Sequence, residues 1–566
     1  MRNIVVVECF SSGKNYINDI IDRDYNPVVL EVKSLDDSFE GKRYHKDLEA
    51  CYAAINNDFE LIHEKDSYEE TLEMVREYDP LLVVPGSEKG VILATKLAND
   101  LNLLCNPIEN IDAMTLKDKM HERLAENNVR SIRGRVIESV EEAIDFYDSE
   151  GLKKVVVKPV YSAGSVGVRL CNNKTDMLKA IDDIFSHKGI YGNDLSKLLI
   201  QEQIEGPEYV VNTVSCNGIH RVTSIWKYKK QTTSEGGQIY DYDEVIRELD
   251  IGETELVEYA YNVEDALGIK YGSVHGEYMI DENGPVLIEV NCRPHGSNMD
   301  IEFLNRIFGH HETDCSLDSY LNPRKFHLDR KRGYKTFAYG YVKDFIVPKD
   351  LIVKSSPIRD IGIHLKSHYK TSMNFRESQL VSKTQDLETS GGSIYLVNKD
   401  YRQIKKDLEF LRKVERRAFG LVLSDDKSED IDIDGVKINQ NIKILLESIE
   451  DFGSVLLVTE EKFEGLNIKQ VTADNLDEIN GKFDCVIVNL NESIYYESAG
   501  KVSRKFIDIF DRVKVGGLIF IPNTTYDFLP NGRLGAEALM KLLDFNLEIP
   551  MHKLTKMIIA SKELGY

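Results

Sequence analysis

The sequence predicts a multidomain protein of mixed α/β and α+β class, and three observations support this class. The chain has 566 residues, more than one hydrophobic core usually holds, and a chain of this length typically divides into about three or four domains. Hydrophobic residues make up 42% of it and charged residues 29%, which is ordinary for a globular protein. Short apolar runs alternate with helical stretches at both ends of the chain, as expected of parallel sheets covered by helices.

The first hundred residues alternate buried-type strands with helices. The expected strands are Ile4–Val7, Pro27–Val32 and Leu81–Val84, and the expected helices are Lys14–Arg23 and Glu88–Asn99. We therefore expect residues 1–112 to form a Rossmann-like domain. The domain has no G-x-G-x-x-G motif, so a dinucleotide role has no support.

The middle of the chain predicts two further lobes. In residues 113–195 the expected elements are helices Leu116–Glu126, Val140–Asp148 and Thr175–Phe185 and strands Ile132–Val136, Lys154–Pro159 and Val166–Cys171. They predict a small α+β lobe, and residues 196–420 predict a larger, strand-rich one. The stretch Ser424–Gly435 is polar and acidic, and we therefore expect a linker over residues 421–435. The remainder, residues 436–566, predicts another α/β domain with strands at Gly453–Thr459, Phe483–Leu490 and Gly517–Pro522.

Charge and cysteine content restrict the partners and the compartment. The net charge of −24 disfavours a nucleic-acid backbone or an anionic membrane as the main partner. The eight cysteines are scattered, with no C-x-x-C and no zinc-type cluster, so we expect a reduced, cytoplasmic chain. The start, MRNIVVVECF, indicates a first strand rather than a secretory signal, and no stretch is long enough to span a membrane.

The first motif is VVVKPVYSAGSVGV, residues Val155–Val168. A strand ends at Lys158, and a turn rich in small residues follows. The small residues of the turn are Ser162, Ala163, Gly164, Ser165 and Gly167. Small residues let backbone N–H groups approach phosphate oxygens, and the lysine supplies a positive charge. Because the turn joins two strands, a Walker loop, which opens a helix, is excluded; a simple hairpin turn is the alternative.

The second motif is LLIQEQIEGPEYVV, residues Leu198–Val211, in which a turn at Gly206–Pro207 joins two strands. The backbone of such a connection can bind an adenine ring, and Glu208 can accept hydrogen bonds from ribose hydroxyls. The alternative is again a simple hairpin.

The third motif is HGEYMIDENGPVLIEVNCRPHGS, residues His275–Ser297, and contains two strands joined by an Asn-Gly turn. Glu289 and Asn291 lie two apart on one strand, so both side chains face the same way. Glu277 on the other strand can point into the same space. Two carboxylates and an amide oxygen suit Mg²⁺, and Arg293 suits a phosphoryl or carboxylate group. An exposed strand face with ordinary charges is the alternative, and it fits the apolar run VLIEV poorly.

The order of these motifs resembles that of the ATP-grasp superfamily. Residues 1–418 resemble its L-amino acid ligases, the dipeptide synthetases related to the bacilysin-forming enzyme, and FSSGKNY, VPGSEKGV, LKDKM and EYVVNTVSCNGIHRVTSIWKYKK also match. The resemblance implies a pre-ATP-grasp domain (1–112), a small lid lobe (113–195) and a large lobe (196–420). It also implies an ATP-dependent carboxylate–amine ligase acting on amino acids or a related small acid. Such a ligase forms an amide or peptide bond through an acyl phosphate and releases ADP and phosphate.

The resemblance also implies roles for single residues. Those assigned to ATP are Lys119 and Lys158 for the phosphates, Ser162, Gly164, Ser165 and Gly167 for the phosphate turn, Gln201, Gln203 and Ile204 for adenine, and Glu208 for ribose. Glu277, Glu289 and Asn291 would bind two Mg²⁺ ions. Arg293 would hold the acyl phosphate, and Lys230 is a candidate for the γ-phosphate. We expect His275, His295 and the pair His310–His311 near the substrates, with a purely structural role as the alternative.

Residues 453–563 look similar to the later strands of a class I methyltransferase. The glycine-rich loop expected after the first strand is replaced by GSVLLVTEEKFEG, so we expect a degenerate, non-catalytic domain for dimerisation, substrate gating or docking. The alternatives for the whole chain are a bicarbonate-activating carboxylase, a nucleotide-binding accessory protein and a bifunctional ligase–methyltransferase. The expected partners are a small carboxylate and an amine, without nucleic acid or membrane, and a homodimer is possible.

Overall fold

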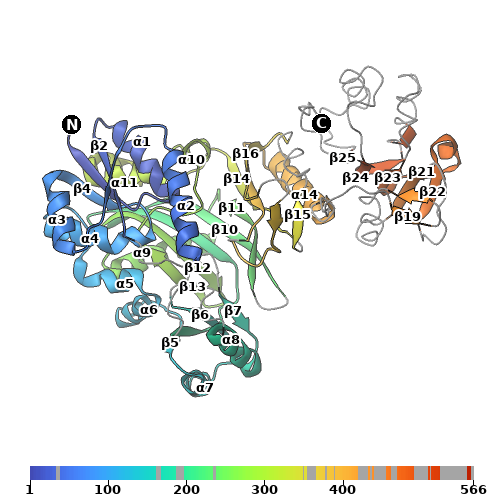
Figure 1. The fold of residues 1–566 in the computed structure, drawn as a ribbon. Coiled ribbons are helices and arrows are strands. Elements are labelled where there is room, and N and C mark those ends of the chain that lie inside the picture. The colour runs from blue at the N-terminus through green and yellow to red at the C-terminus, as the bar shows by residue number, and fades with distance from the viewer. Residues whose placement is uncertain are drawn as a thin grey trace. The chain divides into compact units, whose positions relative to one another are not determined.

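The computed structural model divides the chain into two compact units, Met1–Tyr341 with Gln385–Glu388, and Val342–Thr384 with Thr389–Tyr566 (Figure 1). The structure describes residues 1–33, 39–160, 167–186, 197–233, 237–347, 350–353, 365–375, 379–387, 389–418, 431–433, 436–438, 454–459, 468–489, 508–509, 512–522 and 557–561. Within these residues, no helix combines the length and the apolar character that crossing a membrane requires.

The first unit begins with a four-stranded parallel sheet in the order β3-β2-β1-β4. Its strands are β1 (Asn3–Val7), β2 (Asn26–Glu31), β3 (Glu60–His63) and β4 (Pro80–Pro85), and its helices are α1 (Asn15–Ile21), α2 (Phe39–Ala53), α3 (Tyr68–Glu77) and α4 (Val91–Asp100). Alternate side chains of a strand point to opposite faces. Val5 and Val7 therefore pack with α3 and α4, while Ile4 and Val6 pack with α1.

The small lobe is a four-stranded antiparallel sheet in the order β5-β8-β6-β7. Its strands are β5 (Gly134–Ile137), β6 (Val155–Pro159), β7 (Arg169–Cys171) and β8 (Leu198–Glu202), and α7 (Val140–Ser149) and α8 (Lys174–Ser186) pack on it. Because β8 pairs with β5 and β6, this sheet extends past the predicted boundary at residue 195.

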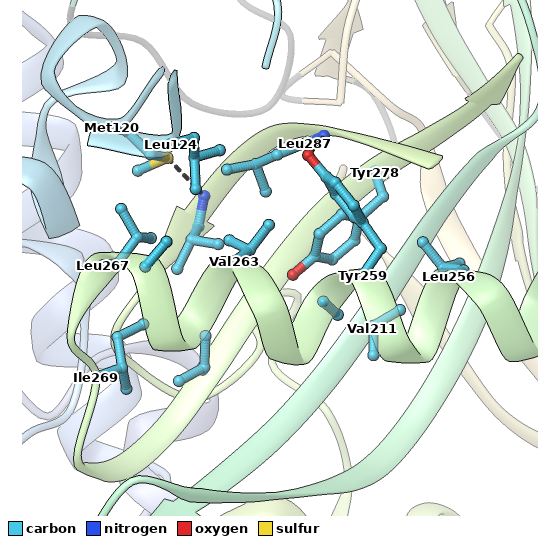
Figure 2. Close-up of a cluster of buried hydrophobic side chains, with 14 of the residues drawn as sticks. Met120, Leu124, Val211, Leu256, Tyr259, Val263, Leu267, Ile269, Tyr278 and Leu287 are labelled. Atoms are coloured by element: carbon cyan, nitrogen blue, oxygen red, sulfur yellow. Dashed lines mark hydrogen bonds between the residues drawn. The ribbon is translucent and has the colours of Figure 1, made fainter. Parts of the chain in front are cut away.

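The large lobe carries an antiparallel sheet in which the strands run in the order β13-β12-β9-β10-β11. They are β9 (Glu208–Cys216), β10 (Ile219–Thr232), β11 (Gln238–Val245), β12 (Tyr271–Asp281) and β13 (Gly284–Asn291). The helix α9 (Ile251–Leu267) covers one face of this sheet (Figure 2). It begins at a capping box between Asp250 and Glu253 and ends at Gly268, whose φ of 78° suits glycine.

The core beneath α9 also fixes the helix that follows the first domain, α6 (Lys117–Glu126). Leu256, Tyr259, Val263 and Leu267 form the buried stripe of α9. Met120 and Leu124 of α6 pack into the same cluster, and the backbone N–H of Val290 lies 3.2 Å from the Met120 sulfur (Figure 2). The direction in which α6 points its lysines is therefore set by Met120 and Leu124.

The remaining elements of the first unit are short. They are η1 (Ser11–Lys14), η2 (Glu88–Gly90), η3 (Ile108–Asn110), α5 (Ile111–Thr115), α10 (Ile301–Phe308), α11 (Glu312–Leu321) and α12 (Pro323–Lys331). Helix α11 packs against α1: Tyr16 donates a hydrogen bond to Ser316 at 2.8 Å, and His311 lies 2.8 Å from Asp19.

The described residues of the second unit include several short strand pairs and one larger sheet. The first pairs are β15 (Leu351–Val353) with β17 (Gln379–Val381), and β16 (His368–Met373) with β18 (Gly392–Asn398), followed by α14 (Tyr401–Ala418). Strand β14 (Tyr339–Asp344) begins in the first unit and ends in the second. Of the predicted linker, residues 421–435, only β19 (Ile431–Ile433) lies within the described residues, and it pairs with β20 (Val436–Ile438).

The last strands form a five-stranded sheet in the order β22-β21-β23-β24-β25. They are β21 (Val455–Thr459), β22 (Lys469–Thr472), β23 (Phe483–Asn489), β24 (Val513–Pro522) and β25 (Met557–Ser561), and the 3-10 helix η6 (Ala473–Glu478) follows β22. All neighbours are parallel except β25, which runs antiparallel to β24. The predicted strands of this domain are therefore present.

Candidate active site

A cavity of about 180 Å³ lies in the first unit and is lined by residues of both lobes. The apolar part of its wall is formed by Ile132, Val156, Val168, Leu170, Ile204, Met279 and Ile288. The charged part is formed by Lys117, Lys158, Glu208, Lys230, Glu277 and Glu289. An apolar slot beside clustered cations and carboxylates matches a ligand with a flat base and a polyanionic tail. We call this space the nucleotide cavity.

Two buried lysines stand at the carboxylate end of the nucleotide cavity. The Lys117 ammonium lies 2.7 Å from the carboxylate of Glu289, and its side chain is 11% exposed. Lys158, at the end of β6, is also buried. Burial, together with the neighbouring Lys117 charge, lowers the pKa of Lys158 to about 8. An added anion would stabilise both ammonium groups.

A third lysine is held by a glutamate on the neighbouring strand. Lys230 of β10 lies 2.6 Å from Glu208 of β9, and its ammonium lies 4.3 Å from the ring centre of Tyr240. Burial alone would lower the pKa of Lys230, but Glu208 outweighs it and the pKa is raised. A bound ligand would therefore meet Lys230 as a cation.

The two carboxylates of the third motif face each other across neighbouring strands. Glu277 of β12 and Glu289 of β13 are register partners, and the Asn291 amide donates to Glu289 at 3.1 Å. Burial and the negative charge of Glu289 raise the pKa of Glu277. Burial would also raise the pKa of Glu289, but Lys117 outweighs it and lowers that pKa to about 2.

These residues fit a divalent cation. Two carboxylates and an amide without a thiol are the donors that Mg²⁺ takes, and a cation between Glu277 and Glu289 would relieve their mutual repulsion. Among the described residues, no group of three or more His, Cys, Asp and Glu side chains forms a self-sufficient metal site. A metal bound here would need further oxygens from phosphate or water.

The structure brings a different lysine of LKDKM than the predicted Lys119 to the nucleotide cavity. Lys119 points away from the nucleotide cavity: its side chain is 48% exposed and it pairs with Glu122 at 2.8 Å on the outer face of α6. Lys117 lines the cavity instead. Residue 117 lies three positions before Met120 and therefore shares the buried face of the helix, whereas residue 119 does not. The buried pair Met120 and Leu124 was the sequence signal that could have identified Lys117.

The turn and the connection between the lobes are described in part. Ser162, Gly164 and Ser165 lie outside the described residues, whereas Gly167 adopts a φ of 72° just before β7. Gln201 and Ile204 line the nucleotide cavity, and the Gln201 amide nitrogen is buried without a hydrogen-bond partner among the described residues. A base edge bound here could supply one.

The side chain of Gln203 also lacks a partner at one atom. Its backbone N–H donates a hydrogen bond to the backbone carbonyl of Lys154 at 3.2 Å. Its side-chain oxygen is buried and accepts no hydrogen bond within the described part of the chain. The nucleotide cavity does not include Gln203 in its wall.

Arg293 and His275 lie beside the nucleotide cavity rather than in its wall. Arg293 donates to the Pro294 carbonyl at 3.0 Å and lies 3.5 Å from Glu88. Its charge still reaches Glu277, whose pKa it lowers in part. The Nδ1 atom of His275 lies 2.8 Å from the side-chain oxygen of Asn212, and its Nε2 atom lies 3.4 Å from the Glu277 carboxylate.

The other three predicted histidines meet at a second, smaller cavity. His295, His310 and His311 line it, and the His295 ring stacks on the ring of His275 with centroids 4.5 Å apart. Burial lowers the pKa of His295 well below its usual value and that of His310 to about 4. Both imidazoles are therefore neutral at pH 7.

Parts of the chain are similar to known proteins. Residues 151–300 match the family model of the ATP-grasp domain. Dapdiamide A synthase from Enterobacter agglomerans is 28% identical over 429 residues, 75% of this chain and 98% of that protein.

Two solved structures share the fold. The L-amino acid ligase from Bacillus licheniformis has a TM-score of 0.55 at 15% identity, covering 73% of this chain and 97% of that chain. The N5-carboxyaminoimidazole synthase from Aspergillus clavatus, solved in complex with ADP, has a TM-score of 0.52 at 13% identity. The match covers 74% of this chain and 99% of that chain. The predicted mixed α/β multidomain fold is confirmed.

Proposed function

We propose that this chain, an ATP-grasp ligase that forms C–N bonds, activates the carboxylate of an amino acid or a related small acid and joins it to an amine. The observation that carries the proposal is the nucleotide cavity, in which Lys117, Lys158 and Lys230 stand close to the paired carboxylates Glu277 and Glu289. The names of two similar proteins, an L-amino acid ligase and a dapdiamide synthase, support amino acids as substrates.

In this proposal the nucleotide lies along the cavity with its base in the apolar slot. Gln201 accepts from the adenine amino group through its side-chain oxygen, Gln203 and Ile204 offer backbone groups, and Glu208 binds ribose. Lys117 takes the phosphate role first expected of Lys119, and Lys158 and Lys230 neutralise the remaining phosphate charge. Gly167, whose φ of 72° leaves the backbone open to close approach, would lie beside the phosphates.

Glu277, Glu289 and Asn291 would hold magnesium, proposed as two ions, which would supply charge neutralisation at the transferred phosphoryl group. The residues of the chain position the reactants. A carboxylate oxygen attacks the γ-phosphorus and ADP leaves, giving an acyl phosphate held by Arg293. The neutral amine then attacks the acyl carbon, loses a proton, and expels phosphate. The lobes must exclude water, because an acyl phosphate hydrolyses readily.

The domain of residues 436–566 is proposed to be methyltransferase-like and non-catalytic. The parallel arrangement of β21, β22, β23 and β24, with β25 antiparallel at the edge, supports that architecture. We also propose a cytoplasmic location, supported by the seven cysteines whose side chains the structure describes, all of them free thiols. A homodimeric assembly is proposed because it is the commonest one for soluble oligomeric proteins.

Release of ADP and phosphate in the presence of carboxylates and amines tests the proposal. We expect ATP hydrolysis to require both an acid and an amine, and mass spectrometry to show an amide. Glu289→Ala should abolish the reaction, with the exposed Glu302→Gln as the matched control. A wild-type protein that binds ATP but releases no ADP with any acid would favour the accessory-protein alternative instead.

A further inference from the structure

The second cavity, which we call the histidine cavity, is small and closed in by both polar and apolar residues. Its volume of about 20 Å³ leaves room for roughly one water-sized group. Trp226, Leu304 and Phe308 form apolar parts of its wall, and His295 and Glu312 form polar parts. The cavity therefore has space for one small polar group, such as an ammonium group.

Glu312 is the residue that lacks a partner in this cavity. It opens helix α11 and is 8% exposed. One carboxylate oxygen accepts from the His295 backbone N–H at 2.9 Å, while the other is buried and has no hydrogen-bond partner among the described residues. Burial raises the pKa of Glu312 to about 8, and a cation bound beside it would favour the ionised carboxylate. A buried carboxylate left half-bonded is costly unless a donor arrives.

The other polar groups of the wall already bind one another. The Asn212 amide donates to Ser224 at 2.8 Å and lies 3.2 Å from His295, and Trp226 donates to Ser224 at 3.0 Å. Neither His295 nor His310, both neutral, offers a positive charge to Glu312. The missing partner of Glu312 is therefore expected to come from a ligand.

Nearby charges do not remove this need. Arg293 lowers the pKa of Glu312 in part, but its guanidinium is bonded to the Pro294 carbonyl and lies beside Glu88. His311, next to Glu312 in the chain, is bound to Asp19 and Asn305 at 2.8 and 2.9 Å. A cationic donor on the substrate would thus meet a carboxylate that no described side chain satisfies.

The histidine cavity lies close to the proposed reaction centre. His295 lines the histidine cavity, and its ring stacks on the ring of His275. His275 in turn lies 3.4 Å from Glu277, which lines the nucleotide cavity. Two imidazole rings therefore separate Glu312 from the phosphate end. An α-ammonium lies only one carbon from the reacting carboxyl carbon. A side-chain ammonium lies further from it, as the two intervening rings require.

We infer that the histidine cavity binds a side-chain ammonium group of the acid substrate through Glu312, so that the preferred acid is a diamino acid. This inference rests on the proposed function. The ammonium group would occupy the cavity and donate to the unpaired oxygen of Glu312. The methylene group that carries it would lie against the apolar part of the wall. Glu312 is thus a specificity-determining residue.

The test compares acids that differ only in this group. Hydroxylamine serves as the amine, and ADP release is measured with diaminobutyrate against norvaline and with ornithine against norleucine, in which methyl replaces ammonium. We expect wild-type kcat/KM to favour at least one diamino acid by roughly 10- to 100-fold, as for a hydrogen bond to a charged group. Glu312→Gln should remove most of that preference and leave the KM for ATP nearly unchanged, with Glu302→Gln as the matched surface control.

The outcomes separate the two proposals. If no acid supports ADP release, the proposed function fails. If norvaline and norleucine react as well as the diamino acids, or if Glu312→Gln retains the preference, the cavity holds only water and the inference fails while the ligase function stands. Should Glu312→Gln unfold in a thermal melt, the wild-type comparison alone decides.

Discussion

Replacing Lys117 by methionine should cost most of the ATP-dependent activity, whereas the same change at Lys119 should cost little. The Lys117 ammonium, 2.7 Å from Glu289, contributes most to lowering the Glu289 pKa from 4.5 to about 2. That shift corresponds to about 3 kcal/mol. Removing one member of a buried charge pair has a cost of the same order. The expected loss in kcat/KM for ATP is therefore roughly 100- to 200-fold.

Lys119→Met is the matched control because it removes the same charge from the same helix. Its partner Glu122 is 59% exposed, and such surface pairs contribute about 0 to 1 kcal/mol. Initial rates of ADP release against ATP concentration, with acid, amine and Mg²⁺ saturating, measure both variants. A larger loss for Lys119→Met than for Lys117→Met would refute the assignment of Lys117 to the phosphates.

Three further predictions concern the same unit. The pKa of Lys158 is about 8, so its positive charge is lost as the pH rises through that value. We therefore expect kcat/KM for ATP to fall up to tenfold per pH unit above about pH 8. A pH profile of kcat/KM that is flat in the wild type and the same in Lys158→Arg would contradict this. Glu277→Gln should raise the Mg²⁺ concentration needed for half-maximal ADP release at least tenfold, whereas an unaltered Mg²⁺ titration would argue against a metal at this carboxylate. Leu267→Ala, in the core beneath α9, should lower the free energy of unfolding in urea by about 2 to 5 kcal/mol and leave the KM for ATP unaltered. A change in that free energy below about 1 kcal/mol would mean that Leu267 is not tightly packed in this core.

Strands with buried apolar runs were predictable, and an exposed edge strand was not. The run Ile4–Val7 became the central part of β1, and the predicted strand Lys154–Pro159 became β6. Strand β3 was missed because only Ile62 of its four residues is buried, so neither an apolar run nor an alternation marks it. Helix α2 was missed as well, since the apolar residues of its sequence FEGKRYHKDLEACYA do not recur with a clear helical period.

The paired carboxylates of the site could be read from strand geometry, whereas the choice of lysine could not be made from the motif alone. Positions 289 and 291 share a face in any strand, and the structure joins them by a hydrogen bond. Positions 117 and 119 lie on different faces of a helix, so the choice depends on which face packs into the core. Only the burial of Met120 and Leu124 decides it.

The partnerless oxygen of Glu312 depends on contacts that the sequence does not reveal. Its neighbourhood assembles Asn212, Trp226 and His295 from distant strands and loops, and His311 binds Asp19 across 292 positions. Residue types in EVNCRPHGS and HHETDC suggest polar chemistry, but which oxygen stays unsatisfied follows only from the packing.

The most direct test of the proposed reaction uses an acid whose carboxylate carries the heavy isotope of oxygen. If the carboxylate attacks the γ-phosphorus, one labelled oxygen bridges to phosphorus and leaves with phosphate when the amine attacks. Mass spectrometry of the released phosphate should then show one heavy oxygen per turnover, with ADP unlabelled. Unlabelled phosphate, or label found in AMP, would contradict activation of the acid as an acyl phosphate.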